Sequence, residues 1–177
     1  MPPALVRSRR LAAGLALFAT TIGFSGCSLS GDSTLPAFTD PATQTYALNT
    51  GVTIANMTRV NAQLYREDVV VGTGRIVNVG DSIGVYYSAR LTGGFAFDPG
   101  RARPATPFFT VLDSTRLIQG WPQGLAGMRV GGTRRLVIGP ELGYKFSTVR
   151  DQAGAVLIPA NSVITFTVEM AEAITRN

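Results

Sequence analysis

The sequence contains no histidine and a single cysteine, Cys27, among its 177 residues. Without histidine, the chain lacks the side chain that most often acts as a general base near neutral pH and as a metal ligand. One cysteine cannot form an intrachain disulfide, and a zinc site built from cysteines is disfavoured. We therefore predict that the protein uses no metal and no cofactor.

Clustered positive charge is also missing beyond the N-terminus. The formal net charge is +5, and Arg7, Arg9 and Arg10 supply three of these charges. The remaining basic residues are scattered singly or in pairs, which argues against a nucleic-acid-binding surface. A hydrophobic fraction of 45% is nevertheless enough to build a core, and the length suits one domain with an extension.

The three N-terminal arginines precede a short apolar segment at residues 11–24. A fourteen-residue helix spans about 21 Å, less than the roughly 30 Å of a bilayer core. The pattern therefore favours a secretory signal over a permanent transmembrane helix.

The apolar segment ends in Ser25-Gly26-Cys27, which resembles a bacterial lipobox, where the cysteine is lipidated and becomes the mature N-terminus. Ordinary cleavage beside an incidental cysteine is the alternative. We predict a signal peptide at residues 1–27, a lipid on Cys27 and a membrane-anchored protein on the periplasmic side of the cell envelope. Because Ser28 rather than Asp follows the cysteine, we expect the outer membrane in an organism that has one.

Two further regions follow the signal. Residues 28–50 are rich in Ser, Thr, Pro, Gly and Asp and show little periodicity, which predicts a flexible tether. Residues 51–177 contain strand-like segments and predict one globular domain. In residues 83–91, alternate positions are apolar, as in a half-buried strand. Tyr87 then points inward, and its hydroxyl needs a hydrogen-bonding partner. We expect about five strands and one helix.

Residues 117–128 contain the only tryptophan, Trp121, within a short segment that is rich in glycine. Pro122 follows at what we expect to be the first position of a short helix, where its missing N–H costs nothing. A large aromatic ring beneath a short helix predicts the floor of an apolar pocket. A tryptophan buried in an ordinary core is the alternative.

The spacing from Ile118 through Gly120-Trp121 to Met128 resembles the signature of the FKBP family of peptidyl-prolyl isomerases, which also bind macrolides such as rapamycin. Phe97-Asp98 after a hairpin turn and a loop ending at Tyr144 are similar to other family motifs. The resemblance covers about residues 69–172. It implies an α+β fold, in which a strongly twisted antiparallel β-sheet wraps around one short α-helix.

The resemblance also implies a pocket for proline-containing polypeptides. In the family, a backbone N–H at the place of Ile118 and the phenol at the place of Tyr144 bind substrate carbonyls, and Trp121 supports the proline ring. The implied catalytic residues are Tyr87, Phe97, Asp98, Trp121, Tyr144 and Phe166, and the implied substrate-binding residues are Phe108, Leu117, Ile118 and Ile158.

Three functions compete at this point. The first is a peptidyl-prolyl cis-trans isomerase that acts on exported proteins. The second is a chaperone or adaptor with the same fold and little turnover. It gains support from Thr110, where relatives often carry an aromatic residue, and from Lys145 in place of a usual glycine. The third, a structural envelope lipoprotein, is disfavoured by the complete pocket set.

Overall fold

In the part of the chain that the structure describes, seven antiparallel strands form one sheet, and the other elements pack around it. The computed structural model describes residues 36–175. The strand order is β1-β2-β6-β9-β3-β4, and β5 pairs with β3 outside this path. The strands are β1 (Thr58–Asn61), β2 (Leu64–Val70), β3 (Ser82–Leu91), β4 (Ala96–Arg101), β5 (Phe108–Val111), β6 (Thr133–Ile138) and β9 (Ile164–Ile174).

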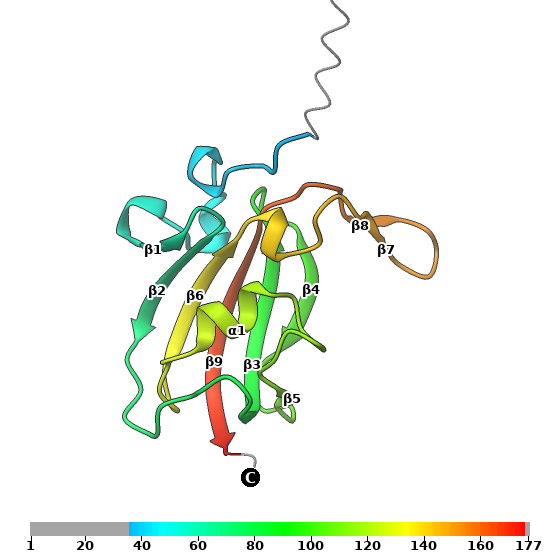
Figure 1. Ribbon diagram of the computed structural model, residues 1–177. Coiled ribbons are helices and arrows are strands. Elements are labelled where there is room, and N and C mark those ends of the chain that lie inside the picture. Colours follow the sequence, from blue (N-terminus) through cyan, green and yellow to red (C-terminus); the bar gives the residue numbers. More distant parts are fainter. Residues whose placement is uncertain (1–35, 176–177) are drawn as a thin grey trace, which may run out of the picture. The chain divides into compact units, whose positions relative to one another are not determined.

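The two longest strands, β3 and β9, lie side by side in the sheet (Figure 1). In β9, Ile164, Phe166, Val168 and Met170 are all buried. This alternation sends one set of side chains to the core and the other set to the opposite face. The inward set of β3 includes Tyr87, as the sequence predicted.

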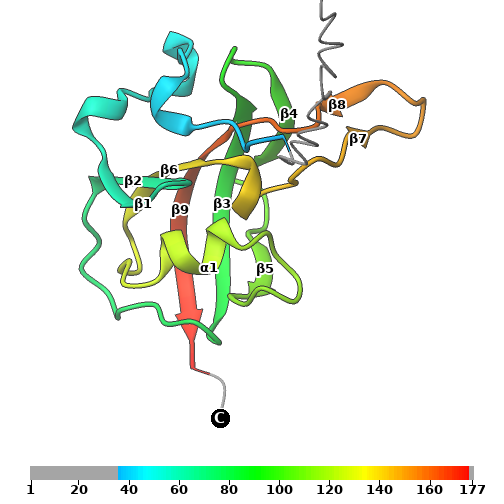
Figure 2. The ribbon, with the colours of Figure 1, turned by 45° about the horizontal axis from the view of Figure 1, so that its top comes forward.

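The helix α1 (Gly120–Leu125) packs on one face of the sheet, and it lies in front of the sheet in both ribbon views (Figures 1 and 2). This arrangement confirms the predicted α+β fold. Pro122 is the third residue of α1 rather than its first. It still lies in the first turn, where backbone N–H groups have no acceptor within the helix.

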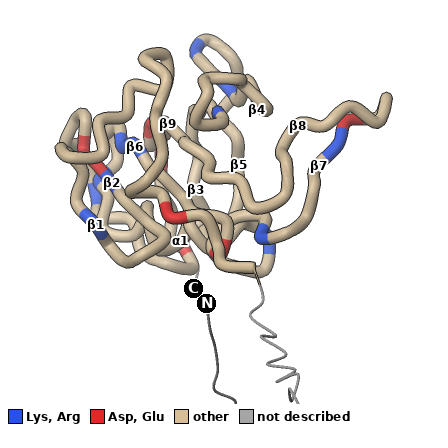
Figure 3. The backbone as a smooth tube through the Cα atoms, turned by 90° about the horizontal axis from the view of Figure 1, so that it is seen from above, with Lys and Arg blue, Asp and Glu red and all other residues tan. Residues whose placement is uncertain are grey.

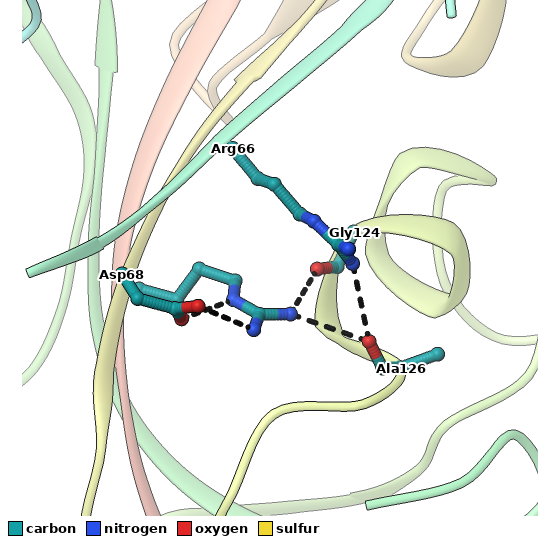
Figure 4. A network of polar contacts seen from close by, with 5 residues as sticks. Arg66, Asp68, Gly124 and Ala126 are labelled. Atoms are coloured by element: carbon teal, nitrogen blue, oxygen red, sulfur yellow. Dashed lines mark hydrogen bonds and ion pairs between the residues drawn. The ribbon is translucent and has the colours of Figure 1, made fainter. Parts of the chain in front are cut away.

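Arg134 on β6 connects α1 to the sheet (Figure 4). Its guanidinium donates to both carboxylate oxygens of Asp68, at 2.7 and 3.0 Å, and to the carbonyls of Gly124 and Ala126, at 2.9 and 3.2 Å. Arg66 also donates to Ala126, at 3.4 Å. These donors satisfy carbonyls that the end of a helix leaves without partners.

The N-terminal part of the described chain covers the other face of the sheet. It contains the 3-10 turns η1 (Pro41–Thr43), η2 (Leu48–Thr50) and η3 (Ile54–Asn56). Its side chains contribute to a second, smaller apolar cluster, formed by Met57, Tyr65, Val137 and Val163 with Tyr46, Val52 and Ile54 against them. Tyr65 and Val137 alternate with core residues of β2 and β6, so this cluster lies on the face away from α1.

Residues 36–50 therefore pack on the domain, whereas their composition predicted part of a flexible tether. Ala47 donates its backbone N–H to Thr92 at 2.8 Å, and Pro41 and Thr50 are buried. The globular unit begins at Pro36 rather than at Gly51. The predicted signal peptide, Cys27 and residues 28–35 of the predicted tether lie outside the described residues.

One 3-10 turn and two short strands lie in the loop between β6 and β9. After the turn η4 (Pro140–Leu142), the strands β7 (Val149–Arg150) and β8 (Val156–Ile158) form a small hairpin that projects away from the sheet (Figures 1 and 2). The carboxylate of Asp151 accepts from the backbone N–H groups of Ala153 and Ala155, which builds the turn between the two strands. The structure thus has more strands than the five expected.

Charged residues of both signs are dispersed along the chain trace (Figure 3). Where arginines gather on β6, acidic residues of β2 are paired with them: Arg134 with Asp68, and Arg135 with Glu67. Within residues 36–175, no helix is long and apolar enough to cross a membrane.

Candidate active site

Trp121 forms the floor of the site because α1 lies very close to β6. A Cβ atom added to Gly120 would lie 2.6 Å from the side chain of Ile138, so glycine is what permits this approach. Trp121 is 4% exposed. Its ring meets Tyr87 and Phe166 edge-on, at centroid distances of 5.5 and 5.4 Å. Such T-shaped pairs are a favourable aromatic geometry and hold the indole in one orientation.

A cavity of about 270 Å³ opens above this floor. Its walls come from β3, β4, β5, β9, α1 and the segments before α1 and after η4. The lining residues are Tyr87, Phe97, Asp98, Phe108, Arg116, Leu117, Ile118, Trp121, Tyr144 and Phe166. The structure thus brings together nine of the ten pocket residues that the resemblance implied.

Three residues differ from the expected arrangement. Ile158 is 2% exposed and packs in the core, so it does not line the cavity. Arg116 does line it, although it belongs to no motif and its only sequence signal is its place just before Leu117. Thr110 is not among the lining residues, and its hydroxyl donates to the Val111 carbonyl at 3.4 Å. The Thr110 side chain therefore contributes nothing to the cavity wall.

The carboxylate of Asp98 is fully engaged within the protein. Its Oδ2 accepts from the hydroxyl of Tyr87 at 2.8 Å, and its Oδ1 accepts from the backbone N–H of Gly100 at 2.7 Å. Gly100 has φ of 68°, and a Cβ atom there would lie 1.8 Å from the Tyr87 carbonyl oxygen. Only glycine therefore fits the turn that holds Asp98 in place.

Both phenols of the cavity remain protonated near neutral pH. Burial, helped by the hydrogen bond to Asp98, raises the pKa of Tyr87 from about 10 to about 12. Burial and the negative charge of Asp98 also raise the pKa of Tyr144. The Tyr87 hydroxyl donates its hydrogen bond to Asp98. The Tyr144 hydroxyl makes no hydrogen bond to another residue in the range 36–175.

The backbone beside the cavity offers one more donor. The Ile118 carbonyl accepts from the N–H of Trp121 at 3.0 Å, which starts α1. The N–H of Ile118 itself has no acceptor among the residues that the structure describes. The cavity thus combines an aromatic cradle with the Ile118 N–H and the Tyr144 hydroxyl, two donors that suit a peptide carbonyl. It contains no nucleophile paired with a base.

These features define a domain with a largely apolar, aromatic cavity that carries a few polar groups and no nucleophile paired with a base among its lining residues. The sequence profile of the FKBP-type peptidyl-prolyl cis-trans isomerases matches residues 74–171, from the loop after β2 to the middle of β9. The chain belongs to this family of enzymes.

Individual relatives support the assignment. The chain is 40% identical to FK506-binding protein 4 of Chaetomium thermophilum over 106 residues, which cover 60% of this chain but 20% of the relative. It is 38% identical to FK506-binding protein 1 of Dictyostelium discoideum over 99 residues, covering 56% of this chain and 87% of the relative. The chain thus spans about a fifth of the first relative and most of the second.

A solved structure with a similar fold is that of FkpA from Escherichia coli. It superimposes with a TM-score of 0.57 and 31% identity, covering 68% of this chain and 52% of the FkpA chain. The antiparallel sheet with one short helix is therefore the FKBP-like fold.

Proposed function

We propose that the domain accelerates cis/trans rotation of Xaa-Pro bonds in exported proteins by holding the prolyl segment in the cavity above Trp121. One observation supports this most. The rings of Tyr87 and Phe166 pack edge-on against Trp121 and line a cavity of about 270 Å³ with it. This volume lies just below the roughly 300–1,000 Å³ of sites for drug-sized ligands, so it suits a short segment such as one proline with its neighbours.

Rotation about a prolyl bond has a barrier because resonance keeps the amide planar, at a height of about 18–20 kcal/mol for peptide bonds. The twisted amide of the transition state has lost that resonance and is less polar. An apolar cavity therefore disfavours the planar amide more than the twisted one, and rotation becomes easier. A millionfold acceleration would require about 8 kcal/mol of this differential stabilisation.

The polar groups of the cavity then serve to hold the substrate. In our proposal, the N–H of Ile118 and the hydroxyl of Tyr144 donate to carbonyls on either side of the proline. Asp98 fixes the orientation of the Tyr87 ring through its 2.8 Å hydrogen bond and takes no proton from the substrate. Macrolides such as FK506, after which the relatives are named, would compete for the same cavity.

The test is exchange kinetics on short Xaa-Pro peptides with the full chain, with and without rapamycin. We expect acceleration that rapamycin abolishes. A folded protein with neither exchange activity nor macrolide binding would leave the chaperone or adaptor function. That alternative is favoured by one observation, the projecting β7–β8 hairpin in the loop that follows Tyr144, which offers a further surface that a client could contact.

We further propose that the protein is exported and anchored by lipid on Cys27. The basic and apolar N-terminal pattern and the position of the only cysteine support this. One acyl chain binds a membrane only marginally, so stable anchoring needs more than one chain. The Cys27→Ser variant should leave the membrane fraction or stay unprocessed, and unchanged fractionation and migration would rule out the anchor.

A further inference from the structure

The chain segment that enters the domain is fastened to the loop that carries Tyr144. The Phe38 ring stacks on Phe146, with centroids 4.8 Å apart and an interplanar angle of 15°. The Thr39 N–H donates to Oδ1 of Asn161 at 3.0 Å, and the Thr39 hydroxyl donates to the Asn161 carbonyl at 2.9 Å. The Asn161 side-chain amide donates to the Ala37 carbonyl at 3.2 Å. We call the contact of residues 37–39 with Phe146 and Asn161 the clasp.

The clasp acts on two residues with unusual backbone angles. Lys145 and Asn161 have φ of 55° and 58°, a left-handed conformation that residues other than glycine rarely adopt. The Asn161 N–H donates to the Lys145 carbonyl, and the Lys145 N–H donates to the Pro140 carbonyl, each at 2.7 Å. Such conformations persist only where the surroundings hold them. Here the clasp holds Asn161, and Asn161 in turn holds Lys145.

Lys145 directly follows Tyr144 in the chain, so its backbone angles set the path of the loop next to the Tyr144 ring. We propose that Phe38 and Asn161 are positioning residues for the isomerase, and that they keep the Tyr144 ring in the cavity wall through the clasp. This rests on the proposed function. Neither residue lines the cavity, so each acts through Tyr144.

The position of the clasp separates this role from general stability. Phe146 is 43% exposed, and neither Phe38 nor Asn161 belongs to either apolar cluster. None of the clasp residues belongs to a strand of the sheet or to α1. Opening should therefore loosen the loop between Tyr144 and Asn161 and leave the rest of the domain folded.

Two variants of the full chain test the proposal. Phe38→Ala removes the aromatic stack, and Asn161→Gly removes the side-chain hydrogen bonds while it tolerates the left-handed φ. We expect kcat/KM for a short Xaa-Pro peptide to fall about three- to tenfold in Phe38→Ala, the range that an aromatic pair of ~0.5–1.5 kcal/mol allows. Phe38→Tyr keeps the stacked ring and should restore activity.

Tyr46→Phe is the matched control. It removes a 2.7 Å hydrogen bond to the Pro41 carbonyl in the same N-terminal segment but does not touch the clasp. We expect it to leave kcat/KM unchanged. Urea unfolding of every variant shows whether the domain is folded, and we expect the midpoints for Phe38→Ala and Asn161→Gly to stay close to that of the wild type.

A double-mutant cycle decides whether the clasp acts through Tyr144. In a Tyr144→Ala background, Phe38→Ala should have no further effect on kcat/KM. Hydrogen exchange gives a reading that does not depend on activity: the Lys145 and Asn161 amide protons should exchange faster in Phe38→Ala than in the wild type. Full additivity in the cycle, or unchanged exchange, would overturn the positioning role.

The result also separates this proposal from the one on which it rests. A folded wild-type chain without isomerase activity would overturn the proposed function and the positioning role together. An active wild type whose Phe38→Ala variant retains full kcat/KM would overturn the positioning role alone.

Discussion

The hydrogen bond between Tyr87 and Asp98 is the polar anchor of the cavity wall. Tyr87→Phe removes the donor and leaves one carboxylate oxygen of Asp98 without its partner. Because Asp98 is half-buried and keeps the Gly100 N–H, we expect a loss near the low end of ~1–3 kcal/mol in the free energy of unfolding. Urea unfolding measures this. Unchanged stability would show that water replaces the phenol without cost.

The two phenols predict how the protein responds to pH. Neither titrates between pH 6 and 8, so exchange activity should be constant there, as kinetics at several pH values can check. The pKa of Tyr87 rises from about 10 to about 12 on folding. The folded state therefore holds this proton more tightly, and the resulting stability is complete below pH 10 and lost as pH rises through 12. A steep change in activity near neutral pH would contradict the mechanism.

Arg116 gives the cavity rim a positive charge that is not neutralised by an ion pair within residues 36–175. We expect peptides with Glu beside the proline to be better substrates than those with Lys. Arg116→Glu should reverse the preference, by up to about fivefold, because exposed ion pairs contribute ~0.2–1 kcal/mol. Arg59→Glu on β1 makes the same change in net charge away from the cavity and should leave the ratio of the two kcat/KM values unchanged.

At the level of single residues, the sequence could predict side chains that a motif or an alternation specifies, such as Trp121 and Tyr87. It could not separate Ile158 from the cavity, because an apolar residue before a proline looks the same in a core and in a pocket wall.

Phe97 is half-buried rather than fully buried. Phe97→Ala should therefore cost less than the roughly 3–5 kcal/mol of a fully buried phenylalanine.

Among the elements, α1 depends on small residues at its contact with β6. A Cβ atom added to Gly124 would lie 2.8 Å from the Leu136 side chain. Gly124→Ala should therefore lower the free energy of unfolding by about 1–3 kcal/mol through overpacking, less a small gain in helix propensity. Gly93→Ala is the control, since no atom lies within 4 Å of its added Cβ. Equal urea midpoints for both variants would contradict the close contact.

Strands were predictable where one face is buried and the other is not, as in β3 and β9. The short edge strand β1 and the β7–β8 hairpin were not, because exposed residues such as those of β1 carry no alternation. Residues 36–50 were missed for a similar reason. They attach through backbone groups and single side chains, such as Thr39 and Tyr46, within a composition that is typical of linkers.

For the whole molecule, the attached N-terminal segment sets where an isolated domain must begin. A chain that starts at Gly51 lacks the buried Pro41 and Thr50, the Tyr46 packing and residues 37–39. We expect it to melt several degrees below a chain that starts at Pro36, at roughly 4 °C per kcal/mol for a domain of this size. Equal melting temperatures in calorimetry would show that this segment adds no stability.

The position of β9 affects the order in which the sheet can assemble during synthesis. This strand comes last among those described, yet it lies between β6 and β3 and pairs with both along most of its length (Figure 1). Until residues 164–174 have been synthesised, β3 and β6 have no common neighbour, and the two halves of the sheet cannot join. Such distant pairing makes folding slow compared with helical proteins. In a growing chain, the two halves of the sheet would thus stay apart until β9 has been made.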